Sequence, residues 1–566
     1  MKAWYMRALG ALALAPVFFT YAVANDSPRP LAPNIDSITL HDLKGDVYFL
    51  AGDEMRGRET CQPEALITAA YVRTRMERAG VKPAGENGTW YQTVKLAHRE
   101  WEEKPSISYT RAGSTVKLAY EQDFVATEGA SVNAQLKDAE VAFAGYAVND
   151  TQRAYNDIEG IDLRGKVALI MRYEPTPWRV GGRRNPFSRS ANLNTKEALL
   201  REAGAAAILM VTGPESLGAT DNRMSLPSPK AAEMSPPLYL AGTGRSSSAL
   251  PFFHVSLEAA DALLGGDGKL LEAQKAFDQG EFKARPDLSK LRVSIDARSR
   301  EVVRECRNVA GKVEGELDEW IIFGAHHDHL GNGYFGSRSP DKMGEIHNGA
   351  DDNASGVATV LEIAEALAQS GVKPRRGFLF LTFTGEEKGL LGSRWYCENP
   401  LVPHHKAIAM INIDMIGRIP NKRLQLQGTA SSSLLDKVCR EAAPLFPDIE
   451  FTFSDRPPMA ASDHWPFYSA AGMPVVFPFG GTNAEMHTTL DDPETINYRD
   501  MVPAVKCLYE IAWRLSLEPA IPDYIGPVKG ATGPDGKPRN PAEKPAAKPE
   551  AEREEEFSRG APPANG

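Results

Sequence analysis

The sequence predicts an α/β protein whose main sheet is mixed, mostly parallel and flanked by helices. Four short runs of β-branched and aromatic residues have the length of buried strands, and helical segments separate them. The runs are WIIFGAHHDH (320–329), GFLFLTFTGEE (377–387), AIAMINIDMIG (407–417) and GMPVVFPFGG (472–481). With 566 residues, 42% of them hydrophobic, the chain is long enough to bury such a sheet on both faces.

A helix is expected between the first two runs, in GADDNASGVATVLEIAEALAQSG (349–371). Its apolar residues recur at helical spacing: Val357, Leu361, Ala364 and Leu367. The segment begins with polar residues and glycine, so Asp351 and Asp352 fall in the loop that leads into the helix.

The two ends of the chain are expected to lie outside the folded body. Residues 1–24 combine Lys2 and Arg7 with the apolar run LGALALAPVFF and a final Ala-Val-Ala, which is typical of a cleaved signal peptide. We therefore expect export to the periplasm or the extracellular space. The run is shorter than the ~20 residues that span a bilayer, so no stable membrane insertion is expected after cleavage; the alternative is an N-terminal anchor. Residues 521–566 are poor in large apolar residues and predict a disordered tail.

Charge and cysteine content exclude several classes of protein. The net charge is −10 and becomes −12 without the leader, because the leader's charged residues are Lys2 and Arg7. This balance argues against nonspecific nucleic-acid binding. The five cysteines are scattered and form no CxxC pair, so buried free thiols are expected, although export permits one or two disulfides. The oligomeric state stays open.

Metal-binding residue types gather where the predicted strands end. Parallel strands present their carboxyl ends at one edge of a sheet, where ligands bind. That edge would carry His326, Glu386, Glu387 and Asp414, and the loop after the last run carries His487. Imidazoles and carboxylates without a thiolate suit two Zn²⁺ or similar ions that share one carboxylate. A carboxylate left over could act as general base toward a metal-activated water.

Strand alternation refines these assignments. His326 and Asp328 face one side while His327 faces the other, so His326 can bind metal with Asp328 behind it to orient the imidazole. The adjacent Glu386 and Glu387 cannot point the same way. One of them should bind metal and the other should reach the water.

The motifs GAHHDHLG, GADDNASG, TGEEKGLLGS, NIDMIG and MHTTLDD, in this order, closely resemble those of the co-catalytic zinc aminopeptidases of the bacterial leucyl aminopeptidase and aminopeptidase Y type. The resemblance implies two zinc ions per chain, a bridging hydroxide, and Glu386 as the general base. It implies that Asp351 bridges the metals and that the remaining ligands are His326, Asp414, Glu387 and His487. It also implies a cis peptide between Asp351 and Asp352.

The resemblance extends over most of residues 45–515. Residues 25–126 look like the N-terminal part of the peptidase domain and residues 286–520 like its catalytic part. Residues 127–285 are similar to a protease-associated (PA) insert, a β-rich module for which a structural lid is favoured over substrate recruitment. SDHWPFY (462–468) is similar to a segment lining the substrate cleft, where Asp463 could hold a substrate α-amine or a ligand histidine.

The residues and the resemblance together indicate an exported zinc metallo-aminopeptidase acting on peptides. Asn353 is expected to be no ligand, and His329, His347 and His464 are expected in outer positions or on the surface. Three alternatives stay open. The same site could serve a carboxypeptidase or amidohydrolase, the chain could be a glutaminyl cyclase-like enzyme with a single zinc, or it could be a noncatalytic PA-containing binding protein.

Overall fold

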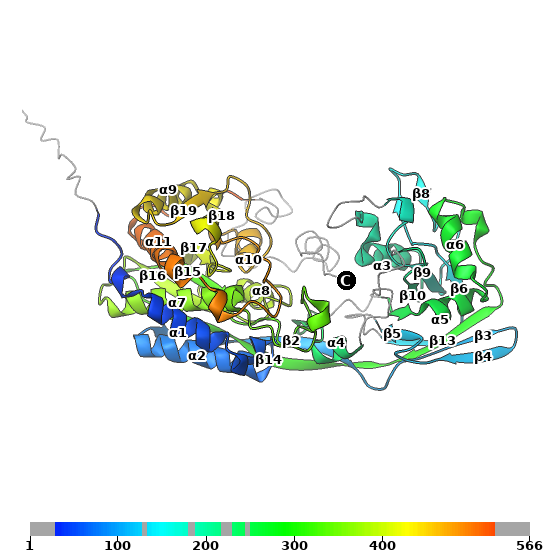
Figure 1. Ribbon diagram of the computed structural model, residues 1–566. Helices are drawn as coiled ribbons and strands as arrows, with labels where there is room; N and C mark the ends of the chain where they lie inside the picture. The colour runs from blue at the N-terminus through cyan, green and yellow to red at the C-terminus, as the bar shows by residue number, and fades with distance from the viewer. Residues whose placement is uncertain (1–28, 127–132, 179–186, 217–228, 244–249, 527–566) are drawn as a thin grey trace, which may run out of the picture.

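The computed structural model describes residues 29–126, 133–178, 187–216, 229–243 and 250–526 and contains two lobes, each built around a sheet (Figure 1). The lobes are joined by strands β2 (Tyr91–Trp101) and β14 (Ser299–Val313). These two strands pair antiparallel from Tyr91 opposite Val309 to Trp101 opposite Ser299. The predicted leader, residues 1–24, lies outside the described residues.

The first lobe holds a ten-stranded mixed sheet in the order β11-β2-β14-β16-β15-β17-β20-β18-β19, with β1 (Lys82–Pro83) paired to β14. Its four central strands are the four predicted runs: β16 (Arg376–Phe383), β15 (Leu317–His326), β17 (Ala407–Asn412) and β20 (Val475–Phe479). These central strands are parallel, whereas β14 and β18 (Arg423–Gln427) pair antiparallel to their inner neighbours. The sheet is therefore mixed, as predicted, and parallel at its centre. Its edge strands are β19 (Glu450–Phe453) and β11 (Tyr239–Leu240).

Helices cover both faces of this sheet, because the central strands bury side chains on both sides. Ile321 and Phe323 pack with one set of helices, α1 (Leu40–Leu50), α2 (Pro63–Ala79), α7 (Ser355–Gln369), α9 (Ser433–Ala442) and α11 (Tyr498–Leu517). Ile322, between them in sequence, packs against α8 (Leu391–Glu398) and α10 (His464–Ser469) on the other face. α7 is the helix expected within residues 349–371, and a single π-type turn, Ala350–Ala354, leads into it.

The second lobe holds an eight-stranded mixed sheet in the order β4-β3-β13-β6-β9-β10-β12-β5. Its strands are β3 (Ser106–Arg111), β4 (Ser114–Leu118), β5 (Phe124–Ala126), β6 (Ala134–Phe143), β9 (Val167–Met171), β10 (Ala207–Val211), β12 (Phe252–Val255) and β13 (Leu291–Ala297). A short hairpin, β7 (Asn149–Asp150) and β8 (Tyr155–Asn156), and helices α3 (Leu193–Glu202), α5 (Leu257–Leu264) and α6 (Lys269–Asp278) complete it. Because β3 and β13 belong to this sheet, the insert is wider than the expected residues 127–285. That it is a PA module stays a prediction.

Two expectations about the rest of the chain need correction. Cys61 and Cys306 form a disulfide across a sequence separation of 245 residues, while Cys439 and Cys507 are buried free thiols. The expected tail does not begin at residue 521. Asp523 accepts hydrogen bonds from Ser432 and Ser433 at the start of α9, so the chain is packed against the first lobe at this point.

No helix within the described ranges is long and apolar enough to cross a membrane.

Candidate metal centre

Four of the five predicted ligands lie at one edge of the main sheet, where its parallel central strands end: His326, Glu387, Asp414 and His487. β15 ends at His326, and β16 and β17 end shortly before Glu387 and Asp414. The loop after β20 carries His487. Strand geometry therefore brings together side chains that lie far apart in the sequence.

The first group of donors consists of His326, Asp352 and Asp414, all of them buried. His326 Nε2 lies 3.2 Å from Asp352 Oδ1 and 3.4 Å from Asp414 Oδ1. The Nδ1 of His326 is 3.1 Å from the carbonyl oxygen of Asp328, to which it can only donate. This leaves the Nε2 lone pair free to bind a metal ion.

The second group of donors surrounds the other oxygen of Asp352. His487 Nε2 lies 3.0 Å from Asp352 Oδ2 and 3.4 Å from Glu387 Oε2. Its Nδ1 is 3.1 Å from the carbonyl oxygen of Gly336, so His487 also presents Nε2 to the site. The two oxygens of Asp352 thus face two different imidazoles, as a carboxylate that bridges two ions requires.

The structure corrects the expected role of Asp351. Its Oδ1 accepts a hydrogen bond from the Gly417 amide (2.7 Å), and its Oδ2 accepts one from Asn483 Nδ2 (2.9 Å). Both oxygens are therefore engaged, and Asp352 lies between the two donor groups instead. The cis peptide is likewise one residue later than expected, between Asp352 and Asn353. Two adjacent aspartates look the same in a sequence motif, and only the turn before α7 distinguishes them.

Glu386 lies beside the first donor group. Its Oε2 is 4.0 Å from His326 Nε2, and burial raises the pKa of this carboxyl well above its ordinary value. Burial also acts to raise the pKa of Glu387, but His487 and His329 together outweigh it, and the pKa of Glu387 is lowered. The neighbouring glutamates therefore differ in environment, which sequence alternation anticipated.

Asp328 does not orient His326 as expected, because its carboxylate is 4.0 Å from His326 Nδ1 and its main-chain carbonyl accepts the proton instead. The carboxylate accepts hydrogen bonds from Thr60 Oγ1 (2.6 Å) and from the Glu386 amide (3.2 Å). Asp328 thereby fixes the backbone of the loop that carries Glu386. His327 points away, toward Thr382, as alternation predicted.

His329 is a residue whose place at the site the sequence reasoning missed. It is buried, and its Nδ1 lies 2.7 Å from Glu387 Oε1, in a second possible metal group with Asp352 and Glu387. It follows the end of β15, where strand alternation no longer indicates direction. The other two histidines have partners away from the ligands: His347 pairs with Ser337 Oγ and His464 with the carbonyl of Met459.

Asp463 is fully buried, and neither of its carboxylate oxygens has a hydrogen-bond partner. Burial raises the pKa of this carboxyl to about 7, and the positive charge of a protonated His326 opposes that shift. The site therefore contains a further acid next to Glu386, His326 and Asp414, whose charges act on one another.

Unpaired buried donor atoms indicate that the site fits metal ions. His326 Nε2 and Asp414 Oδ1 are buried and lack hydrogen-bond partners. Such atoms destabilise the folded protein unless an ion or another group binds them. Burial alone would lower the pKa of His487, but Glu387 and Asp352 raise it to about 10, so protons and metal ions compete for this imidazole.

Arg58 holds the loops of the centre together. Its guanidinium is buried and donates to the carbonyls of His327 (3.2 Å), Asn348 (2.7 Å) and Gly349 (2.9 Å), as well as to that of Leu50. One side chain therefore ties the end of β15 to the turn that carries Asp352.

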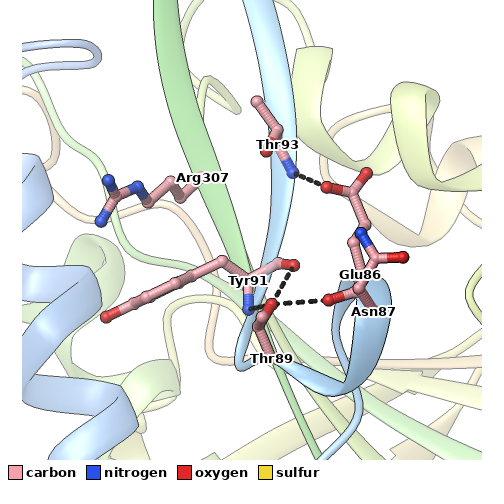
Figure 2. A pocket seen from close by; sticks show the side chains of 6 residues that line it. All are labelled: Glu86, Asn87, Thr89, Tyr91, Thr93 and Arg307. Atoms are coloured by element: carbon pink, nitrogen blue, oxygen red, sulfur yellow. Dashed lines mark hydrogen bonds between the residues drawn. The ribbon is translucent and has the colours of Figure 1, made fainter.

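A surface pocket of about 360 Å³ lies apart from the predicted ligands (Figure 2). It is lined by Glu86, Asn87, Thr89, Tyr91, Thr93 and Arg307. The bonds drawn in Figure 2 close a turn: Glu86 Oε2 accepts from the Thr93 amide (3.1 Å), and Thr89 Oγ1 donates to the Glu86 carbonyl (2.8 Å). We assign the pocket no chemistry.

The chain is similar to known peptidases in sequence and in fold. The family model described as "Peptidase family M28" matches residues 308–511. Leucine aminopeptidase 1 of Penicillium rubens is 26% identical over 228 residues, which are 38% of this chain and 57% of that protein. The match thus spans less than two thirds of that relative.

Two solved structures share the fold over nearly their whole length. An aminopeptidase from Aneurinibacillus sp. strain AM-1 has a TM-score of 0.52 at 18% identity and covers 87% of this chain and 96% of its own. A zinc aminopeptidase from Bacillus subtilis has a TM-score of 0.50 at 18% identity and covers 86% and 96%. The residues that match the model of peptidase family M28, 308–511, contain every metal-donor residue described above.

Proposed function

We propose that the protein is a zinc-dependent aminopeptidase with two metal ions per chain. The observation that carries the proposal is the position of Asp352, whose two oxygens face His326 at 3.2 Å and His487 at 3.0 Å. His326 and Asp414 would hold one ion, Glu387 and His487 would hold the other, and Asp352 would bridge them. Zinc is supported by the imidazole and carboxylate donors and by the zinc aminopeptidase of similar fold.

The residues of the chain have separable tasks in peptide hydrolysis. Bound zinc ions would supply Lewis acidity, polarising the scissile carbonyl and making a water molecule acidic enough to react. Glu386, next to the donor groups but outside them, would take the proton of the attacking water and deliver it to the leaving amine. Its raised pKa suits a group that must hold a proton between these two steps.

Asp328 and Asp463 would support this chemistry without being ligands. Asp328 accepts the Glu386 amide and Thr60 Oγ1, and so holds the base in place. Asp463 has two unpartnered oxygens beside the base and the first donor group. We keep it as a candidate group for the positive charge of a substrate α-amine.

One observation favours a second candidate, a carboxypeptidase. Arg418 follows Gly417, whose amide contacts Asp351, and its Nη1 is buried without a hydrogen-bond partner. A substrate carboxylate could bind such a guanidinium. Its Nη2, however, lies 3.3 Å from Glu485, which already supplies one negative charge, so the aminopeptidase is preferred.

Substitution of Glu386 by Gln tests the proposal. The variant should keep two zinc ions by elemental analysis, yet lose about 10²- to 10⁴-fold in kcat on aminoacyl fluorogenic substrates. Glu387→Gln is the matched control, because it should lose zinc as well as activity. Unchanged turnover in Glu386→Gln would refute the base, and a single zinc in the wild-type protein would favour a glutaminyl cyclase-like enzyme.

The substrate panel decides between the two exopeptidases. Peptides with a free amine and a blocked carboxyl end should be cleaved, and peptides with an acylated amine should not. The opposite preference, together with loss of activity in Arg418→Met, would establish the carboxypeptidase.

We also propose that the protein is exported. The leader pattern supports this, and so does the disulfide between Cys61 and Cys306, because disulfides persist mainly in oxidising compartments. Fractionation of cells and N-terminal sequencing should find the chain outside the cytoplasm and beginning after Ala24; full-length cytoplasmic protein would contradict export.

A further inference from the structure

A segment of the insert returns to the first lobe and is called the arm here; it comprises residues 229–243. The arm contains helix α4 (Pro229–Met234) and strand β11 (Tyr239–Leu240), and in Figure 1 the α4 label stands between the two lobes. β11 pairs antiparallel with β2, where Leu240 lies opposite Leu96, and the Ala241 amide donates to the Lys95 carbonyl at 2.8 Å. The insert is thus attached to the peptidase sheet by the arm as well as by the joining strands.

Ser235 of the arm bridges a buried ion pair of the first lobe. Lys388 Nζ lies 3.4 Å from Glu59 Oε1, and the two side chains are only 4% and 11% exposed. The Ser235 hydroxyl donates to Glu59 Oε1 and accepts a hydrogen bond from Lys388 Nζ at 2.5 Å. Ser235 is itself buried.

Lys388 and Glu59 both adjoin segments that contribute to the metal centre. Lys388 directly follows Glu387, and its ammonium group lies over the Phe335 ring at 4.3 Å. Phe335 precedes Gly336, whose carbonyl accepts the Nδ1 proton of His487. Glu59 follows Arg58, which binds the carbonyls of the loops around His326 and Asp352.

Burial makes the Ser235 hydroxyl important for the Lys388–Glu59 ion pair. A buried ammonium group and a buried carboxylate need further hydrogen bonds in addition to their mutual attraction. Serine satisfies both, because it donates to the carboxylate and accepts from the ammonium group. Without this hydroxyl, Lys388 and Glu59 keep each other but lose the partner that they share. The loss falls next to Glu387, because Lys388 follows Glu387 in the chain.

We propose that Ser235 allows the arm to position Glu387 and His487, the ligands of the second donor group. Docking of the arm and binding of metal would then stabilise each other. The inference rests on the metal centre of the proposed function. Coupling between two binding events is reciprocal, so zinc must tighten the arm to the same degree as the arm tightens zinc.

Zinc titration of the metal-free protein against a competing chelator tests the first direction. Ser235→Ala should weaken one of the two zinc ions by about 10- to 100-fold, as loss of a supporting contact around a metal site commonly does. Ser235→Thr, which keeps a hydroxyl, should restore most of that affinity. The matched control is Ser256→Ala, which removes the N-cap that accepts from the Ala259 amide in the insert and should leave both zinc affinities unchanged.

Hydrogen exchange tests the reciprocal direction. The Ala241 amide should exchange about 10-fold or more slowly in the zinc-loaded protein than in the metal-free protein, and Ser235→Ala should abolish this difference. If the wild-type protein binds two zinc ions but neither the zinc affinity of Ser235→Ala nor the exchange of Ala241 changes, the coupling is refuted while the metal centre stands. If the wild-type protein binds no zinc, the proposed function itself fails.

Discussion

The exchange of Asp351 and Asp352 for asparagine, one at a time, is the sharpest test of the metal centre, because the residues are adjacent and only one of them faces both donor groups. Asp352 Oδ1 lies 3.2 Å from His326 Nε2, and its Oδ2 lies 3.0 Å from His487 Nε2. An asparagine there would offer one neutral oxygen and an NH₂ group, which cannot bind a cation. We expect Asp352→Asn to lose at least one ion and to bind the other at least 100-fold more weakly.

The effect of Asp351→Asn should be structural and small. Its Oδ1 can still accept from the Gly417 amide, but its NH₂ group would face the Asn483 amide that now donates to Oδ2. The loss of one hydrogen bond costs about 1 kcal/mol in the free energy of unfolding. Transmitted fully to the adjacent ligand, that energy would weaken metal binding by only about 5-fold.

Elemental analysis after dialysis, chelator competition and urea unfolding measure these quantities on the same three proteins. Asp351→Asn should retain two zinc ions and lose about 1 kcal/mol of stability. The reverse pattern, with both zinc ions lost in Asp351→Asn and both kept in Asp352→Asn, would refute the assignment of Asp352 as the bridge.

Three further predictions concern stability. Arg58→Met leaves four backbone carbonyls without their donor and should destabilise the metal-free protein by about 3 to 5 kcal/mol in urea unfolding; a loss below 1 kcal/mol would contradict this role. Replacing Cys61 and Cys306 by alanine should cost about 2 to 4 kcal/mol, equal to the loss that reductant causes in the wild-type protein. His254 is buried in the insert, and burial lowers its pKa to about 3. The folded protein keeps it neutral while the unfolded chain protonates it below pH 6.5, so its contribution to stability falls by about 2 kcal/mol from pH 7.5 to pH 5 and His254→Leu should remove that part of the pH dependence.

Most of the first lobe could be predicted because its signals are local. The four apolar runs became four neighbouring parallel strands, since a continuous apolar run is what a strand buried on both faces needs. The topology then placed His326 and the residues after the other strands at one edge. The boundaries of the insert could not be predicted as well. β3 and β13 pair with each other although most of the insert's sequence lies between them.

The sequence alone determined the kind of chemistry, because residue types at strand ends carry it: imidazoles, carboxylates and the adjacent Glu386 and Glu387. Only the tertiary structure decided which atoms meet. It placed Asp352 between the donor groups where the motif had suggested Asp351, brought His329 to Glu387, joined Cys61 to Cys306, and set Ser235 between Lys388 and Glu59. The physical reason is that these contacts depend on the direction in which turns point side chains and on segments that lie far apart in the chain. The periodicity of a sequence gives information only about residues that are close to one another in the chain.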